Sequence, residues 1–519
     1  MHLRLLVLFA ALTACGGTQS DPAVGTGGAV GMGGAVGTGG ASSGGSPVVS
    51  NGGSAGSGGC LPFQSIQGGR CSPAFAGGFL PAGYVRDLAM APDGSFYVVG
   101  VFEKATDFDP SAEVDLHTPA SVTDAYVTHF AADGSYLWTN TIGSTGAPVG
   151  VTVAAVDQDG MLFIAGGYTG PADLDPGPGM DVVAETTPKS VAFIAKWDAT
   201  GALVTSVRFP GDPAAGGLQF NGLALGANGE VYAVGALFGK VDLHLPAGDG
   251  TLSAASGVFH GFGLSLGSDL KTRWGFESAQ SNFVDVSAGT QGSVWIAGYF
   301  EGTVDFDPSS ATNDQTSAGH QDAIALHVDA EGALLSATRA GGTEYDAATG
   351  VSAAADGSAY VLGWANPSGF QVGGVTPAAP ADISDIFFAR LGESGAPTWV
   401  DVLGGPGSDT PTRLLATTDG VIALGSAESP NVAFDRAATL PWPGKPNSGF
   451  ISQRRADGSH VSTIPFGGSA YFVPQHVALS ATSMVILGLY GGTPDLDPGP
   501  ETFALPIAEN TYWVARFEL

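Results

Sequence analysis

The sequence predicts an all-β fold in which seven four-stranded units close into a ring, and three observations support it. A sequence motif of two apolar runs joined by a tight polar turn, with a glycine at its end, recurs seven times. The closing glycines are spaced at 66, 69, 63, 65, 62 and 63 residues. The last unit also stops one strand short of completion. The closing glycines are Gly100, Gly166, Gly235, Gly298, Gly363, Gly425 and Gly488. Repeats of this size bury their faces only against their neighbours.

The first unit illustrates the four strands. Residues 85–91 alternate apolar side chains, 92–94 form a Pro-Asp-Gly turn, and 95–102 run back with many strand-forming residues. After a longer segment, residues 125–130 and 135–142 make a second hairpin. Each unit is therefore expected to be a four-stranded antiparallel meander.

The first hairpin of each unit turns on a short polar sequence. We expect its glycine to supply the positive φ that a tight hairpin requires. The seventh copy lacks the glycine and turns near Thr482-Ser483. The glycine turns after the first unit are Asp159-Gly160, Asn228-Gly229, Gln291-Gly292, Asp356-Gly357 and Asp419-Gly420.

The chain ends discriminate between a ring and an open stack. Residues 512–517 read as the third strand of the last unit, and the sequence stops at Leu519. The segment 71–78, around Phe75, lies before the first unit and would supply the missing fourth strand. Such closure removes a free sheet edge. We therefore predict a seven-bladed β-propeller over residues 60–519, with the last blade closed by an N-terminal strand.

The first residues are a targeting segment, not part of the fold. His2 and Arg4 precede an apolar run over 5–12 that is too short to span a bilayer permanently. Leu12-Thr-Ala-Cys15 resembles the lipobox of bacterial lipoproteins. The resemblance implies a signal peptide over 1–14, lipidation of Cys15, and anchoring in the bacterial cell envelope, with the outer membrane favoured by Gly16. An ordinary secretory signal cut after Ala14 is the alternative.

Residues 15–59 are predicted to be a lipidated, glycine-rich tether without a core, with a reach of roughly 35 to 40 Å. Cys60 and Cys71 follow at the boundary with the repeats. In an exported chain this remaining pair favours a disulfide, and two free thiols are the alternative.

The charge balance restricts the partners. Asp and Glu total 48 against 18 Lys and Arg, which gives a formal net charge of −30. A surface of that sign repels phosphate backbones, so we exclude nucleic acid as a partner. Solubility and turn formation are the preferred explanation of the acidity, and attraction of cations is the alternative.

The repeat resembles the bacterial SBBP-type β-propeller repeat, from the Asp-Gly turn through Val-Val-Gly or Ile-Ala-Gly to the Asp-Phe-Asp-Pro segment and the Asp-Ala strand start. The resemblance covers residues 71–519 and implies an exported or surface propeller with no particular reaction. Copies five and six depart from it, with Val372-Gly-Gly-Val375 and Ala433-Phe-Asp-Arg436 in place of Asp-Phe-Asp-Pro.

Four segments between second and third strands carry Asp-x-Asp-Pro and are candidate calcium sites. Paired carboxylates are the hard oxygen ligands that Ca²⁺ prefers, although two carboxylates alone supply at most four of the six to eight oxygens. The alternative, which we favour, is that Asp and Pro build a turn. The candidates are Asp107, Asp109, Asp173, Asp175, Asp305, Asp307, Asp495 and Asp497.

No catalytic constellation is evident, and no cofactor other than calcium is suggested. Gly263-Leu-Ser265-Leu-Gly267 matches a hydrolase pattern but lies in a third strand, so Ser265 is interpreted as structural. His129 and His327 occupy equivalent third-strand positions and are interpreted as repeat residues. Trp138, Trp274 and Trp399 recur in fourth strands, which favours packing between blades.

Two functions remain. The first is a lipid-anchored, non-catalytic binding module, expected to be a monomer, for an unknown protein or glycan. The second is a polysaccharide-directed hydrolase or lyase with a loop-built site. Binding is preferred because no nucleophile, base and orienting group can be named together. We expect the ligand on the face formed by the connections from second to third and from fourth to first strands.

Overall fold

The structure is a computed structural model, and the chain divides into two units, Met1–Gly45 and Ser46–Leu519. All described residues belong to the second unit. They are 75–79, 83–144, 146–177, 179, 181–182, 190–212, 216–245, 250–255, 258–366, 368–377, 384–428, 431–435, 438–441, 448–468, 471–480, 483–492, 494–495 and 508–518. Within them, no helix has the length and hydropathy needed to cross a membrane.

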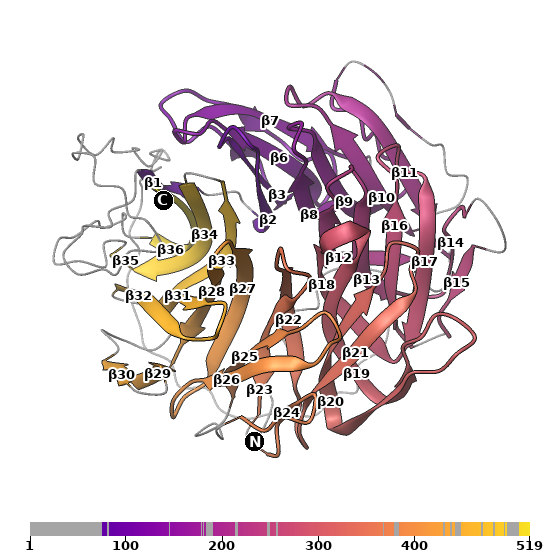
Figure 1. The fold of residues 1–519 in the computed structure, drawn as a ribbon. Coiled ribbons are helices and arrows are strands. Elements are labelled where there is room, and N and C mark those ends of the chain that lie inside the picture. Colours follow the sequence, from indigo (N-terminus) through magenta and orange to yellow (C-terminus); the bar gives the residue numbers. More distant parts are fainter. Residues whose placement is uncertain are drawn as a thin grey trace, which may run out of the picture. The chain divides into compact units, whose positions relative to one another are not determined.

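Seven antiparallel sheets form the blades of a β-propeller around a central axis (Figure 1). Each blade runs from an inner strand outward. Blade 1 is β2 (Gly83–Met90), β3 (Phe96–Phe102), β6 (Asp124–Phe130) and β7 (Tyr136–Ile142); blade 2 is β8 (Val149–Val156), β9 (Leu162–Thr169), β10 (Ser190–Trp197) and β11 (Leu203–Pro210); blade 3 is β12 (Leu218–Leu225), β13 (Val231–Leu237), β16 (His260–Leu266) and β17 (Thr272–Ala279).

The remaining blades follow the same order. Blade 4 is β18 (Ser281–Ala288), β19 (Val294–Asp305), β20 (Asp314–Val328) and β21 (Leu334–Gly341); blade 5 is β22 (Ala347–Ala353), β23 (Ala359–Ala365), β25 (Asp385–Leu391) and β26 (Pro397–Leu403). Blade 6 is β27 (Asp409–Thr417), β28 (Gly420–Ala427), β31 (Ser448–Arg455) and β32 (His460–Gly468); blade 7 is β33 (Phe472–Leu479), β34 (Ser483–Gly492), β36 (Ala508–Glu518) and β1 (Phe75–Phe79).

The ring closes as the sequence predicts. Strand β1 pairs antiparallel with β36, from Phe75 opposite Arg516 to Phe79 opposite Tyr512. The inner strand β2 contacts both β8 and β33, so the first blade adjoins the second and the seventh. The prediction of seven blades closed by an N-terminal strand is confirmed.

Two outer edges are covered by the following blade. β24 (Gln371–Val372), from the long connection of blade 5, pairs with β21, and β35 (Pro494–Asp495), from that of blade 7, pairs with β32. Three further connections form short ladders: β4 (Thr106–Asp107) with β5 (Leu116–His117), β14 (Lys240–Asp242) with β15 (Thr251–Ser253), and β29 (Asn431–Asp435) with β30 (Ala438–Pro441). A 3-10 turn spans Thr290–Gly292.

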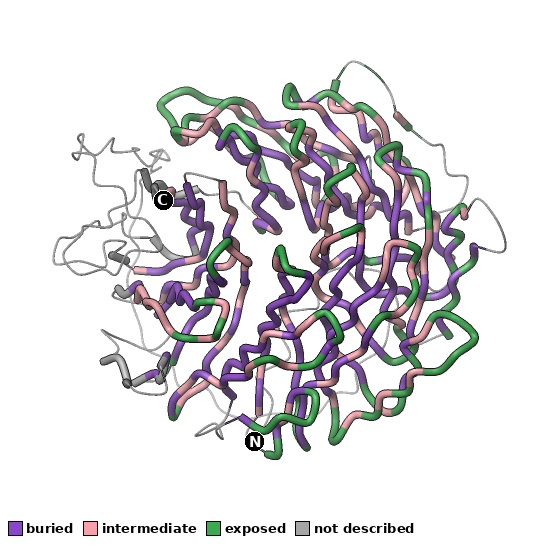
Figure 2. Tube along the Cα trace, in the orientation of Figure 1, coloured by how far each residue is buried: buried purple, intermediate pink, exposed green. Residues whose placement is uncertain are grey.

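The core lies between blades. The described residues form seven hydrophobic clusters, and each combines side chains of two neighbouring blades. Burial accordingly follows the strands, and many of the exposed residues lie in the turns between them (Figure 2). The predicted packing role of the fourth-strand tryptophans agrees with this arrangement: Trp274 Nε1 donates to the Ala330 carbonyl and Trp399 Nε1 to the Ala456 carbonyl, each on the next blade.

The closing glycines have a steric origin. Each inner strand carries a β-bulge opposite the closing glycine of its partner strand, as where Val85 pairs with Gly100 and Asp87 then pairs with Val99. A Cβ on Gly100 would lie 2.1 Å from the Tyr84 carbonyl oxygen. The bulge brings the two backbones too close for any side chain.

One turn differs from expectation. The hairpin glycines Gly160, Gly229, Gly292 and Gly357 do have positive φ. Gly420 does not, because it lies inside β28, where it pairs directly with Thr417 across a two-residue turn. The prediction that Gly420 supplies a positive φ is therefore wrong.

Candidate functional site

Charged residues meet on the propeller axis. On each inner strand, ladder pairing resumes beyond the bulge at the residue two positions after the partner of the closing glycine. In four blades this residue is titratable: Asp87 in blade 1, Asp285 in blade 4, Arg413 in blade 6 and His476 in blade 7. A β-bulge re-aims a side chain. Contacts link these four side chains in series, although blade 6 adjoins neither blade 1 nor blade 4, which places them in the central channel.

The four form a chain of ion pairs, named here the axial cluster. Asp87 Oδ1 lies 3.1 Å from His476 Nδ1 and 3.5 Å from Arg413 Nη2. On its other side, Arg413 Nη1 donates to Asp285 Oδ1 at 3.4 Å. The Arg413 side chain keeps 26% of its surface exposed, while those of Asp87 and Asp285 keep 11% and 13%. Arg413 therefore links blade 6 to blades 1 and 4.

The second oxygen of each carboxylate reaches the next blade. Asp87 Oδ2 accepts a hydrogen bond from the Ala154 amide at 2.9 Å, and Asp285 Oδ2 accepts one from the Val351 amide at 3.0 Å. Ala154 directly follows Val153, which corresponds to Asp87 on the inner strand of blade 2, and Val351 directly follows Gly350, which corresponds to Asp285 on that of blade 5. The cluster thus stabilises contacts that involve six of the seven blades.

Burial and pairing move the pKa values in opposite directions. Burial raises the pKa of Asp87, but the His476 hydrogen bond and the Arg413 charge outweigh it, so the pKa lies below its ordinary value. Burial dominates at Asp285, whose pKa is raised despite Arg413. At Arg413 burial lowers the pKa, and the charges of Asp285 and Asp87 more than compensate.

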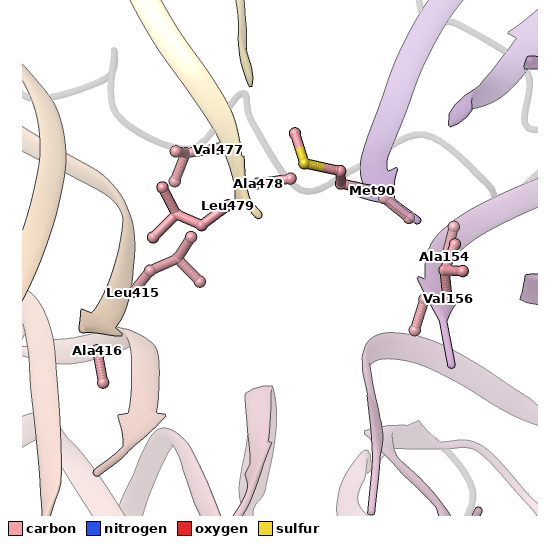
Figure 3. A pocket seen from close by; sticks show the side chains of 10 residues that line it. Met90, Ala154, Val156, Leu415, Ala416, Val477, Ala478 and Leu479 are labelled. Carbon is pink, nitrogen blue, oxygen red and sulfur yellow. The ribbon is translucent and has the colours of Figure 1, made fainter. Parts of the chain in front are cut away.

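A shallow, open hollow of about 280 Å³ lies at one end of the channel, with apolar side chains and polar backbone groups in its lining. It is lined by the last residues of four inner strands: Ala89, Met90, Ala154, Ala155, Val156, Leu415, Ala416, Val477, Ala478 and Leu479. Figure 3 shows the side chains of Leu415 and Leu479 on one side of an open space and those of Met90 and Val156 on the other. We call this cavity the axial mouth.

The axial mouth and three members of the axial cluster share strands β2, β27 and β33, whereas Asp285 lies on β18, which does not line the mouth. Ala89 and Leu415 follow Asp87 and Arg413 by two residues, so their side chains share a strand face with them. Two residues along a strand span about 6.6 Å. The Ala154 amide that binds Asp87 belongs to a lining residue. The ion pairs therefore lie immediately below the apolar walls.

This end of the channel is not the face expected from the sequence. The lining residues directly precede the hairpins between first and second strands, whereas the long connections lie at the opposite end of the strands. Residues on these hairpins include the exposed carboxylates Asp93, Asp159 and Asp419.

The Asp-x-Asp-Pro segments form turns in which the carboxylates accept backbone hydrogen bonds. Asp107 Oδ1 accepts from the amides of Asp109 at 3.2 Å and Asp115 at 2.9 Å. Asp173 and Asp305 repeat this arrangement. The second aspartates, Asp109, Asp175 and Asp307, each accept from the amide two residues later. These contacts are those of the turn that we preferred to a calcium site.

The other predicted residues are only partly described. Within the described residues, no group of three or more His, Cys, Asp or Glu side chains could hold a metal ion. Asp495 is described in its backbone alone, in β35, and Asp497 lies outside the described residues. Cys15, Cys60 and Cys71 also lie outside them. Calcium binding, lipidation and the disulfide stay predictions.

The third-strand polar residues are packed inside the blades. His129 stacks on Tyr97 with ring centroids 4.1 Å apart, and burial lowers its pKa to about 4. His327 stacks on Trp295 and bonds through Nδ1 to the Glu393 carbonyl of the next blade. Ser265 has no exposed surface. These environments agree with the structural interpretation of all three residues.

Sequence reasoning missed the axial cluster. Its signal is a set of titratable residues at one aligned position of the first strands, 12 or 13 residues before the closing glycine. Asp87, Asp285, Arg413 and His476 all occupy that position. The bulge that turns them toward the axis has no sequence signature of its own apart from the closing glycine.

Comparisons with known proteins identify no relative that could name a function. No protein family and no curated protein matches the chain. Among solved structures, the Dos1 propeller is 10% identical with a TM-score of 0.37, covering 86% of this chain and 95% of that one. An ACO/RPE65 chimera is 11% identical with a TM-score of 0.32, covering 78% and 94%. At these values neither likeness bears on what this propeller binds.

Proposed function

We propose that this chain is an exported, lipid-anchored β-propeller that acts as a non-catalytic binding module and recognises its partner at the axial mouth. One observation carries the location: the cavity is built from apolar side chains of four different inner strands. Ligand sites are concave, mostly apolar and largely pre-formed. The partner is a protein or glycan of the cell envelope.

The axial mouth is suited to binding rather than to reaction. Its ten lining residues are alanine, valine, leucine and methionine, which offer neither a nucleophile nor an acid–base pair. The titratable groups beneath it already pair with one another. A chemical step needs a nucleophile or base with an orienting partner beside the substrate.

Site-specific photocrosslinking tests the location of binding. A photoreactive amino acid replaces Leu479 in the axial mouth or Val204, which is 53% exposed on the outer strand β11. With isolated envelopes, we expect a discrete adduct from position 479 and none from position 204. Equal labelling at both positions would contradict the proposal. Turnover of a polysaccharide panel by the pure protein would favour the hydrolase or lyase alternative instead.

The lipid anchor is tested separately. Leu12-Thr-Ala-Cys15 places the cysteine where a lipoprotein signal would end, and acylation supplies membrane affinity through buried methylene groups. We expect radioactive palmitate to label the wild-type chain but not Cys15→Ser, which should leave the membrane fraction. Palmitate labelling that survives the substitution would refute the anchor while leaving the binding proposal intact.

A further inference from the structure

We propose that the axial mouth takes up the side chain of a lysine or arginine from a partner protein, with the alkyl stem against the apolar walls and the cationic head directed toward the axial cluster. This inference rests on the proposed function and specifies its ligand. It depends on three observations: the lining of the cavity, the charges below it and the charges around it.

The lining matches an alkyl stem. All ten lining residues are apolar, and Figure 3 shows Leu415 and Leu479 across an open space from Met90 and Val156. Lysine and arginine bury their methylene stems along apolar surface while the charged head reaches a polar region. The axial cluster lies about two residues farther along the strands, roughly 6.6 Å away, a distance that a four-carbon stem can span.

The groups below the walls carry both signs of charge. Asp87 and Asp285 contribute two carboxylates, and the guanidinium of Arg413 contacts both. His476 pairs with Asp87. All four side chains retain some exposed surface, from 11% at Asp87 to 26% at Arg413. Both carboxylates are therefore already paired, and Arg413 is the most exposed of the four groups.

The hairpins around this end of the channel carry acidic side chains. None of the seven hairpins that border this end of the channel contains a lysine or arginine in its sequence. Four contain exposed aspartates, namely Asp93, Asp159, Asp356 and Asp419. Three cations from strands of the blades pair with acids of these hairpins: Arg390 with Asp356, Lys196 with Asp157, and Arg273 with Glu230. Charge complementarity of this kind steers an approaching cation and disfavours an anion.

Blocked pentapeptides with glycine on both sides of a central residue provide the probe. The central residue is lysine, arginine, norleucine or glutamate, and norleucine keeps the stem of lysine without its charge. We expect the full mature chain to bind the lysine or arginine peptide about tenfold more tightly than norleucine by ligand-observed NMR, and glutamate not detectably. Equal affinity for lysine and norleucine peptides would overturn the cationic inference and leave the apolar binding site standing.

Variants separate the mouth from the general acidity of the protein. Ala416→Lys places a cation in the mouth, and Val204→Lys makes the same charge change on the outer strand β11. We expect Ala416→Lys to weaken lysine-peptide binding about tenfold and Val204→Lys to change it less than about twofold. Equal weakening by both would overturn the inference, because it would indicate non-specific attraction.

Asp285→Asn tests the floor without filling the mouth. We expect it to weaken the lysine peptide about fivefold while changing norleucine binding less than about twofold. Unchanged lysine binding in a folded variant would refute the role of the axial cluster. If Ala416→Lys does not fold, this variant still decides the question. Crosslinking at position 479 with no affinity for any cationic peptide would refute the inference and retain the proposed function.

Discussion

Arg413→Met removes the cation that joins Asp87 of blade 1 to Asp285 of blade 4. Methionine preserves most of the apolar stem, so the change isolates the charge. Removing one partner of a buried ion pair costs about 3 to 5 kcal/mol. Because 26% of the arginine side chain is exposed, water screens part of this loss, and we expect about 2 to 3 kcal/mol.

The corresponding change in melting temperature is small but measurable. The entropy of unfolding is about 2.1 cal/mol/K per residue, or about 0.9 kcal/mol/K for a domain of about 440 residues. A loss of about 3 kcal/mol therefore lowers Tm by about 3 °C. Calorimetry at neutral pH is the first measurement.

The pH dependence gives a sharper test. In the wild type the pKa of Asp87 is depressed, so its contribution is present above its ordinary pKa of 3.8 and is lost as the pH falls through the lower folded value. Without Arg413, the pKa values of Asp87 and Asp285 should both rise, and protonation then relieves the unpaired charges. The destabilisation by Arg413→Met should shrink as the pH falls from about 7 toward about 4. A destabilisation that is absent, or equal at every pH, would refute the reasoning.

Arg339→Met is the matched control. Arg339 pairs with the fully buried Asp322, and 24% of its side chain is exposed, but both residues belong to blade 4. Hydrogen exchange should increase in β2, β18 and β27 for Arg413→Met and within blade 4 for Arg339→Met. The same exchange pattern in both variants would show that the axial cluster does not join the blades.

Three further predictions follow from the packing and the pKa shifts. Gly166→Ala should lower the free energy of unfolding by more than about 3 kcal/mol in chemical denaturation, because its Cβ would lie 2.0 Å from a backbone oxygen. In the adjacent Gly167→Ala the nearest atom to the new Cβ would lie at 3.4 Å, so this control should cost less than about 1 kcal/mol. Equal effects would contradict the steric account. Asp107→Ala should destabilise the protein by about 1 to 2 kcal/mol, because the amides of Asp109 and Asp115 lose their acceptor. Adding Ca²⁺ at about 1 mM should leave the wild-type Tm unchanged. A calcium-dependent increase in Tm that disappears in the variant would show instead that this segment binds calcium. Burial raises the pKa of Asp346 to about 6. The protonated carboxyl therefore stabilises the folded state below pH 3.8, and this contribution is lost as the pH rises through about 6. Asp346→Asn should flatten the dependence of stability on pH between 3.8 and about 6, and an unchanged slope over that interval would count against the pKa shift.

Much of the fold could be predicted because its determinants are local. The alternation of apolar residues, the hairpin glycines and the regular spacing each report the structure of a few neighbouring residues. The pairing of β1 with β36 could be predicted from the missing strand alone. The prediction for the turn at Gly420 was wrong because a two-residue turn and a longer one with a glycine look alike in sequence.

The candidate site could not be predicted in the same way. Its location depends on the β-bulges, which shift the register by one residue and thereby change the direction of the following side chain. The long connections, which we expected to form the ligand face, instead hold their aspartates in hydrogen bonds to their own backbone.

By itself, the sequence determined that the chain repeats a four-stranded unit seven times and that the ring has a strand with which to close, because periodicity and turn chemistry act over short distances. Only the tertiary structure decided which residues meet on the axis. Asp87 and His476 lie 389 positions apart and come within 3.1 Å only when the first and last blades adjoin. The physical reason is that their contact is created by the closure of the ring and the bulged register of the inner strands, not by any interaction between neighbours in the chain.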